Sequence, residues 1–379
     1  MRTSSRGEVD PFIVMDVMEA ARAEEARGRS IVHMEVGQPG TPAPAPARAA
    51  IARALEAGSL GYTVALGLPE LRARIARLYG DWYGVDLDPG RVVVTSGSSA
   101  GFILAFTSLF EAGDRVAIAE PGYPSYRNIL KALNLVPVGL QTRAEDRFQP
   151  LPADLDPSLA GVLVASPANP TGSMLGRAVL EGLVGAAVDR GIAFVSDEIY
   201  HGIQYGERPV TALELSDEVY VINSFSKYFS MTGWRVGWMV VPEAHVRRIE
   251  RLAQNLYICP PHASQVAALA AIDAVDELEA NLAVYRTNRT LLLDGLPQAG
   301  FGQIAPPDGA FYIYADVSEL TDDSRALARE ILTEAGVAVT PGLDFDPRRG
   351  LGTLRFSYAG TTEAMDDGLT RLVDWFGRR

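Results

Sequence analysis

The sequence predicts an α/β protein, with a large part built on a mostly parallel, seven-stranded sheet covered by helices and a smaller α+β part after it. Two observations support this prediction. Short apolar runs recur along residues 92–241, with helix-like segments between several of them, a pattern typical of parallel strands buried on both faces. After Pro261 the pattern changes to long helical stretches with isolated short strands.

The expected strands are short apolar runs at Val92–Thr95, Val116–Ala119, Val136–Leu140, Val162–Ala165, Ala193–Ser196, Val219–Asn223 and Val236–Val241. Helices are expected between several of them, at Ala100–Phe110, Tyr126–Leu133 and Arg177–Arg190. In sheets of this kind, ligands bind at the carboxyl ends of the strands. The loops that follow the strands are therefore where functional side chains are expected.

Outside the sheet, the prolines of Pro39–Pro46 argue against a helix and favour a stiff connector. A polyproline recognition motif is the alternative. An almost unbroken helix through Ala271–Leu293 would link two domains. The smaller part then continues with a strand at Phe311–Asp316, a helix at Ser324–Ala335, a strand at Thr353–Ser357 and a final helix to Phe376. We expect an N-terminal arm and small-domain segment over residues 1–46, a large cofactor-binding domain over 47–280 and a C-terminal small domain over 281–379.

Composition narrows the function classes. The 379 residues carry a net charge of -13, which argues against a nucleic-acid or anionic-membrane partner. Cys259 is the only cysteine, so no disulfide forms within the chain, which fits a reducing compartment. Cys259 could be either a small buried residue or a nucleophile. The first residues, Met1–Asp10, lack the apolar segment of a signal peptide, and the four histidines lack metal-ligand spacing. We expect a cytoplasmic protein without a metal or a membrane span.

The most informative run follows the strand Val219–Asn223 and surrounds Lys227 with hydroxyl groups. A lysine just past a buried strand can form a Schiff base, because desolvation and a cationic neighbour lower its pKa. Ser224, Ser226 and Arg235 could together hold a phosphate, with the guanidinium as a bidentate donor. The alternative is a solvated lysine on a loop.

Two further strand ends carry polar side chains. Asp197 follows an apolar strand and could keep the ring nitrogen of pyridoxal 5′-phosphate (PLP) protonated; capping the next helix is its alternative role. Tyr200 could donate to the ring oxygen. Asn169 could do the same, although Asn169-Pro170 and Thr171-Gly172 are also ordinary turn dipeptides.

Two more strand ends complete the pattern. The small residues Gly97, Ser98 and Ser99 precede a helix whose N-terminus would favour an anion, and they match neither a dinucleotide nor an ATP motif. Tyr123 could stack on a flat ring, with core packing as the alternative. Five successive strand ends thus supply the residue types that PLP requires.

On these residues the chain resembles the class I and II aminotransferases of PLP fold type I, from Gly37 to Arg355. The most specific part is the run Ser224-x-Ser226-Lys227…Gly233-Trp234-Arg235-x-Gly237. The resemblance implies a ping-pong transfer of an amino group from an amino acid to a 2-oxo acid. A PLP-dependent lyase that cleaves carbon–sulfur bonds is the alternative on the same fold.

The resemblance also implies residue roles. Lys227 would form the Schiff base and carry the proton, with Asp197 and Tyr200 as the other catalytic residues. The cofactor would be bound by Gly97, Ser98, Ser99, Tyr123, Asn169, Asp197, Tyr200, Ser224, Ser226, Lys227 and Arg235, with Tyr62 reaching the phosphate of a neighbouring subunit. The substrate would be bound by Gly37, Asn169 and Arg355, the last on the α-carboxylate. A homodimer with shared active sites follows from the role of Tyr62.

The chain departs from relatives that act on acidic substrates. Its phosphate loop continues as Ser98-Ser99-Ala100-Gly101 and offers no lysine, and no second arginine is evident for a distal carboxylate. We therefore do not expect strict specificity for aspartate or glutamate. Candidate pocket walls, each with core packing as its alternative, are Phe12, Ile13, Val36, Tyr62, Tyr257 and Phe345.

Overall fold

The computed structural model describes residues 1–58 and 60–379. Its largest sheet has seven strands in the order β2-β8-β7-β6-β5-β3-β4. Their bounds are Val92–Thr95 (β2), Arg115–Glu120 (β3), Val136–Gln141 (β4), Gly161–Ala165 (β5), Ala193–Asp197 (β6), Tyr220–Ser224 (β7) and Gly237–Val240 (β8). Only β8 runs antiparallel to its neighbours in this sheet, and the other pairs are parallel. The predicted mostly parallel, seven-stranded sheet is confirmed.

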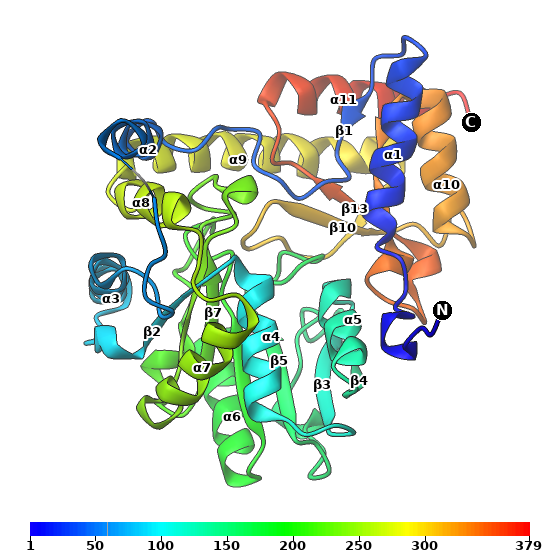
Figure 1. Cartoon of the computed structure of the whole chain (residues 1–379). Coiled ribbons are helices and arrows are strands. Elements are labelled where there is room, and N and C mark those ends of the chain that lie inside the picture. Colours follow the sequence, from blue (N-terminus) through cyan, green and yellow to red (C-terminus); the bar gives the residue numbers. More distant parts are fainter. Residues whose placement is uncertain (59) are drawn as a thin grey trace.

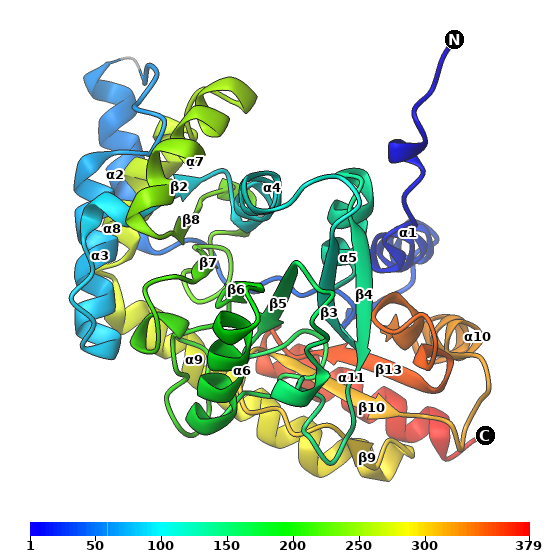
Figure 2. The same ribbon diagram turned by 90° about the horizontal axis from the view of Figure 1, so that it is seen from below.

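Two apolar layers cover this sheet because successive strand residues point to opposite faces. On β5, Val162 and Val164 join one cluster, whereas Leu163 joins the other. The helices around the sheet are α2 (Ala45–Ala57), α3 (Pro69–Tyr83), α4 (Ser98–Leu109), α5 (Pro124–Ala132), α6 (Arg177–Asp189), α7 (Glu243–Leu256) and α8 (His262–Ala271). Figures 1 and 2 show α4 and α7 on one face and α6 on the other.

A second unit contains a four-stranded antiparallel sheet in the order β12-β13-β10-β9. The strands are β9 (Gln303–Ile304), β10 (Tyr312–Asp316), β12 (Thr340–Pro341) and β13 (Thr353–Ser357). The helices are α9 (Val275–Gly295), α10 (Ser324–Glu330), which continues as a π-helical turn to Ala335, and α11 (Thr362–Phe376). Short 3-10 turns lie at Ser5–Gly7, Pro89–Arg91, Pro152–Asp154, Ala212–Glu214, Thr232–Trp234, Leu296–Ala299, Gly342–Asp344 and Gly350–Gly352.

The N-terminal part of the chain joins this second unit. Strand β1 (Val32–His33) pairs in parallel with β11 (Val337–Ala338). Helix α1 (Ile13–Ala26) lies beside α10 (Figure 1). This arrangement accords with an N-terminal arm that belongs to the small domain, although the three boundaries expected from the sequence stay predictions.

Two local predictions were wrong. Helix α2 begins at Ala45, inside the proline-rich Pro39–Pro46, because a proline in the first helical turn lacks only an N–H that has no helical acceptor. The expected helix through Ala271–Leu293 is interrupted between α8 and α9. Asp273, in the interruption, accepts a hydrogen bond from Arg74 Nε at 2.8 Å, which fixes this turn against α3.

Within the described residues, no helix combines the length and the apolar character needed to cross a bilayer.

Candidate active site

A cavity of about 200 Å³ lies where the strand ends of the large sheet meet the second unit. Residues far apart in the sequence line it, from Phe12 to Arg355. The lining includes these residues singled out from the sequence: Gly37, Ser98, Ser99, Tyr123, Asn169, Tyr200, Ser226, Lys227, Arg235 and Arg355. Asp197 and Ser224 are buried beside it rather than in its wall. Tyr62 lies elsewhere, with a side chain that is 83% exposed.

Lys227 follows β7 and directs its amine into this cavity. Its Nζ donates a hydrogen bond to the carbonyl oxygen of Gly37 at 2.6 Å. Burial, and after it the nearby charges of Arg355 and Arg235, together lower the pKa of Lys227 to about 7, against an opposing effect of Asp197. Near neutral pH a large share of this amine is therefore uncharged and nucleophilic.

Gly37 is required for this geometry. A Cβ atom on Gly37 would lie 1.7 Å from the hydroxyl oxygen of Tyr312. That hydroxyl in turn bonds the hydroxyl of Tyr200 at 2.8 Å. The absence of a side chain at residue 37 thus lets its backbone reach Lys227 while two tyrosines close in from the other side.

Asp197 ends β6 and is only 2% exposed. Its Oδ1 accepts a hydrogen bond from the backbone N–H of Ile199 at 3.1 Å, and its Oδ2 accepts one from the hydroxyl of Tyr126. Burial raises the pKa of Asp197 to about 6, although Tyr126, Ile199 and Lys227 oppose this shift. A buried carboxylate with this environment is stabilised by a further cation, such as a protonated ring nitrogen.

Tyr126 was missed in the sequence. It lies in the first turn of α5, three residues after Tyr123, which immediately precedes this helix. The centroids of the two rings are 5.3 Å apart with the rings nearly perpendicular. The spacing between Tyr123 and Tyr126 could have identified it.

An anion cradle forms at the N-terminus of α4. The helix is preceded by Gly97 at φ 78°, which offers no side-chain cap, so the first N–H groups stay free for a ligand. A Cβ on Gly97 would lie 2.3 Å from Nη2 of Arg235. Arg235 itself has a left-handed backbone with φ 51°. The free N–H groups, the hydroxyls of Ser98 and Ser99, and this guanidinium are the donors that a phosphate requires.

Ser224 and Ser226 have different positions relative to this cradle. Ser226 lines the cavity, whereas Ser224 donates its hydroxyl to Ser226 Oγ at 2.8 Å. Ser224 therefore orients the hydroxyl that faces the ligand rather than facing the ligand itself.

Arg355 lies on β13 with 3% of its surface exposed. It donates from Nη1 to Asn169 Oδ1 at 2.9 Å, and from Nη2 to the carbonyl of Glu35 and to Thr340 Oγ1 at 3.3 Å. These acceptors are all uncharged, and its buried Nε has no acceptor among the residues that the structure describes. A buried guanidinium with a spare N–H and no charged acceptor is suited to binding a carboxylate. The alternative of a surface arginine on an edge strand is wrong, since β13 lies between β12 and β10.

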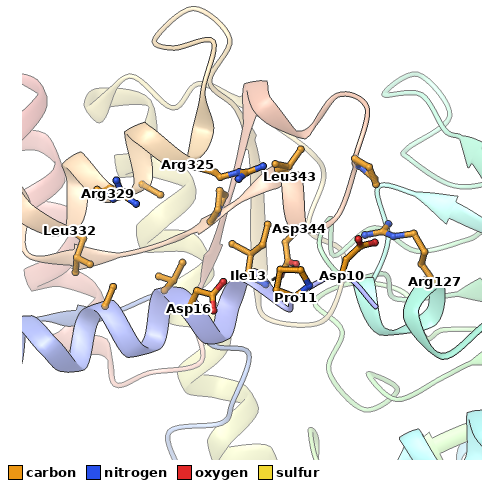
Figure 3. Close-up of a pocket in the computed structure, with 15 residues that line it drawn as sticks. Asp10, Pro11, Ile13, Asp16, Arg127, Arg325, Arg329, Leu332, Leu343 and Asp344 are labelled. Carbon is orange, nitrogen blue, oxygen red and sulfur yellow. Dashed lines mark hydrogen bonds between the residues drawn. The ribbon is translucent and has the colours of Figure 1, made fainter. Parts of the chain in front are cut away.

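Most of the remaining wall is apolar. Its apolar part is formed by Phe12, Val14 and Met15 at the start of α1, together with Val36, Phe102 and Ile199, and the hydroxyl-bearing Tyr126, Thr232 and Tyr312 complete it. Of the candidate walls named from the sequence, Phe12 and Val36 lie here. Phe345 packs its ring 4.7 Å from the Arg355 guanidinium. Ile13 lines a second cavity, of about 530 Å³, whose wall includes residues of α1 and α10 (Figure 3). Tyr62 and Tyr257 line neither cavity.

Comparison with known proteins gives consistent matches. A family model described as aminotransferase class I and II matches residues 29–372. The valine–pyruvate aminotransferase of Mycobacterium tuberculosis is 47% identical over 382 residues, which cover 99% of this chain and 98% of the relative. A solved structure from Silicibacter pomeroyi is 67% identical, covers 100% of both chains and has a TM-score of 0.95. The solved aspartate aminotransferase of Thermus thermophilus is 31% identical, with a TM-score of 0.93 over 99% of this chain and 100% of that one. These matches favour amino-group transfer over carbon–sulfur cleavage.

Proposed function

The chain belongs to the class I and II aminotransferases and is an aminotransferase, and from that premise we propose that it binds PLP through Lys227 and transfers amino groups from apolar amino acids to a 2-oxo acid. The observation that carries this proposal is the Lys227 amine, which faces the anion cradle and the Arg355 guanidinium in one cavity. When bound, PLP supplies an electron sink for the electrons released at the substrate Cα.

The polar residues of the cavity fit this cofactor by their chemistry. The cradle of Ser98, Ser99 and Arg235 would hold the phosphate. Asp197 is buried next to the cavity and would pair with the protonated ring nitrogen, a cation that would lower its raised pKa. Tyr200 and Asn169 line the cavity, and as hydrogen-bond donors they would contact the ring oxygen, while Tyr123 would cover the ring face.

Lys227 would also move the proton. A pKa of about 7 lets the released amine accept a proton from the substrate Cα and return it near neutral pH. The Gly37 carbonyl, 2.6 Å from Nζ, orients this amine when it is not bonded to the cofactor.

The substrate proposal combines the cavity with the relatives. Arg355 would bind the α-carboxylate, with Asn169 holding the guanidinium in place at 2.9 Å. Arg235 and Arg355 are the two arginines of the described cavity wall, and both already have a role, so no guanidinium remains for a distal carboxylate. The wall of Phe12, Val14 and Met15 would instead receive an apolar side chain. Valine as donor and pyruvate as acceptor are thus the first pair to test, as in the name of the mycobacterial relative.

We also propose a homodimer. The exposed Tyr62 lies in a loop that is linked to the start of α8 and to the segment before it. Thr63 N–H donates to Cys259 Sγ at 3.4 Å, and Gly61 O accepts from His262 Nδ1 at 2.9 Å. Exposed apolar side chains on these same segments include Val64 and Ile258, and such surfaces are typical of interfaces. Tyr62 would reach the partner's cofactor phosphate. A cytoplasmic location stays a prediction.

The central experiment is a screen of the twenty amino acids with pyruvate or 2-oxoglutarate as acceptor, read by 2-oxo acid release. Valine, leucine and other apolar donors should react, and aspartate should react poorly. Borohydride reduction followed by mass spectrometry should place the cofactor on the peptide that contains Lys227. Efficient turnover of aspartate only, or labelling of another lysine, would contradict the proposal.

A further inference from the structure

The first turn of α1 forms part of the substrate cavity but has no cap of its own. Phe12, Val14 and Met15 line the cavity where the helix begins. The residue that precedes the helix, Phe12, offers no side-chain acceptor. The first N–H groups of any helix need acceptors from outside it, so this turn depends on another segment to stay formed.

Asp344 supplies these acceptors from the second unit. Its Oδ1 accepts a hydrogen bond from the Ile13 N–H at 3.1 Å, and its Oδ2 accepts one from the Val14 N–H at 3.2 Å. The carboxylate is 2% exposed and lies at the positive end of the helix dipole, where a negative charge is stabilised. Figure 3 shows Asp344 next to Ile13, between α1 and α10.

The segment that carries Asp344 also supports Arg355. Thr340 accepts from Arg355 Nη2 at 3.3 Å, and the Phe345 ring lies 4.7 Å from the guanidinium. One short segment, residues 340–345, therefore contacts both the arginine proposed to bind the carboxylate and the helix turn that lines the cavity.

The rest of α1 is held independently. Ala21, about two turns further along the helix, packs in a small apolar cluster with Leu332 and Ala338. Loss of the Asp344 contact should therefore loosen the first turn of α1 without releasing the whole helix.

We propose that Asp344 is a positioning residue for the donor side chain. By fixing the amides of Ile13 and Val14, it holds Phe12, Val14 and Met15 as a wall against which a branched apolar side chain packs. This inference rests on the proposed use of apolar amino acids. It makes discrimination between large and small apolar donors depend on a carboxylate that does not line the cavity.

The test is the variant Asp344→Asn, which keeps the shape and one acceptor oxygen but loses the charge. The KM for valine should rise about tenfold, which corresponds to about 1.4 kcal/mol, with little change in kcat, because a wall contacts ground state and transition state alike. The KM for alanine, whose single methyl group offers the wall much less apolar surface, should change much less. Hydrogen exchange at the Ile13 and Val14 amides should become faster.

The matched control is Asp323→Asn. Asp323 caps α10 in a similar way, accepting from the Arg325 N–H at 2.9 Å and the Ala326 N–H at 3.3 Å, but α10 does not line the substrate cavity. This variant should lower stability without changing either KM. If Asp344→Asn folds poorly, Ile13→Pro removes one donor of the same contact at a helix position that tolerates proline, and it should give a smaller rise in the valine KM.

An unchanged valine KM in Asp344→Asn would overturn the inference, and so would equal changes for valine and alanine or unchanged exchange at both amides. Failure of the wild-type enzyme to use apolar donors would instead contradict the proposed function. The exchange measurement needs no turnover and would still decide whether Asp344 holds the first turn of α1.

Discussion

Replacing Arg355 by lysine tests the carboxylate site most directly. The guanidinium is buried and shares its N–H groups among Asn169 Oδ1, the Glu35 carbonyl and Thr340 Oγ1, with Nε free. A single ammonium group cannot satisfy these acceptors and also bind a carboxylate in the two-pronged geometry of a guanidinium. The variant should therefore bind the substrate through at least one charged hydrogen bond fewer.

One hydrogen bond to a charged group contributes about 1.5–3 kcal/mol, which is a factor of about 10–150. We expect kcat/KM for valine to fall by about this factor in Arg355→Lys, while the PLP content stays at the wild-type level. The assay is steady-state release of the 2-oxo acid, with the cofactor measured by absorbance. Arg289→Lys is the matched control, because Arg289 donates to a backbone carbonyl at 2.7 Å and stacks on Tyr205 outside the cavity. A kcat/KM within about threefold of wild type, with full cofactor, would refute the role of Arg355.

Three further predictions concern the cofactor site. Lys227→Ala should lose both turnover and the borohydride-fixed cofactor label; turnover at the wild-type rate would remove Lys227 from the mechanism. In the cofactor-free protein, the Lys227 pKa of about 7 lies below the value of 10.5 for an unperturbed lysine, so between these values the unfolded state binds more protons and stability rises with pH. Denaturant unfolding at several pH values should show this rise in the wild type and a smaller one in Lys227→Met, and equal slopes would contradict it. Gly97→Ala should weaken PLP binding at least about tenfold, because the new Cβ would clash with Arg235 at a positive φ. The measurement is a fluorescence titration of the cofactor-free protein with PLP. Gly233→Ala is the control and should bind PLP normally, because a Cβ at this position would have nothing within 4 Å.

The large sheet could be predicted because its strands, apart from the edge strand β4, are largely buried on both faces. Continuous apolar runs such as Val162–Ala165 then mark the strands directly, and β5 extends that run by one residue at its start. The break between helices α8 and α9, just before Val275, has no comparable signal in the sequence, because the residues around it are ordinary helix formers. A tertiary contact, from Arg74 to Asp273, fixes that turn.

In the candidate site too, some residues could be predicted from the sequence and others could not. Side chains at strand ends or in the loops after them, such as Asp197, Lys227 and Asn169, could be named because the carboxyl edge of a parallel sheet brings them together. Tyr312 and Asp344 carry no such local signal. Tyr312 acts through Tyr200 and Gly37, and Asp344 through the amides of a helix at the other end of the chain. Contacts of this kind depend on how the two units pack, which spacing along the chain does not encode.

The parallel pairing of β1 with β11 ties Val32 to Val337 and His33 to Ala338. During synthesis, the first strand must therefore wait for its partner until nearly the whole chain has left the ribosome. The large sheet, whose strands all precede Val241, can form earlier. Arg355, on β13, also leaves the ribosome late. The strand end that carries Lys227 is therefore synthesised long before the arginine proposed to bind the amino acid.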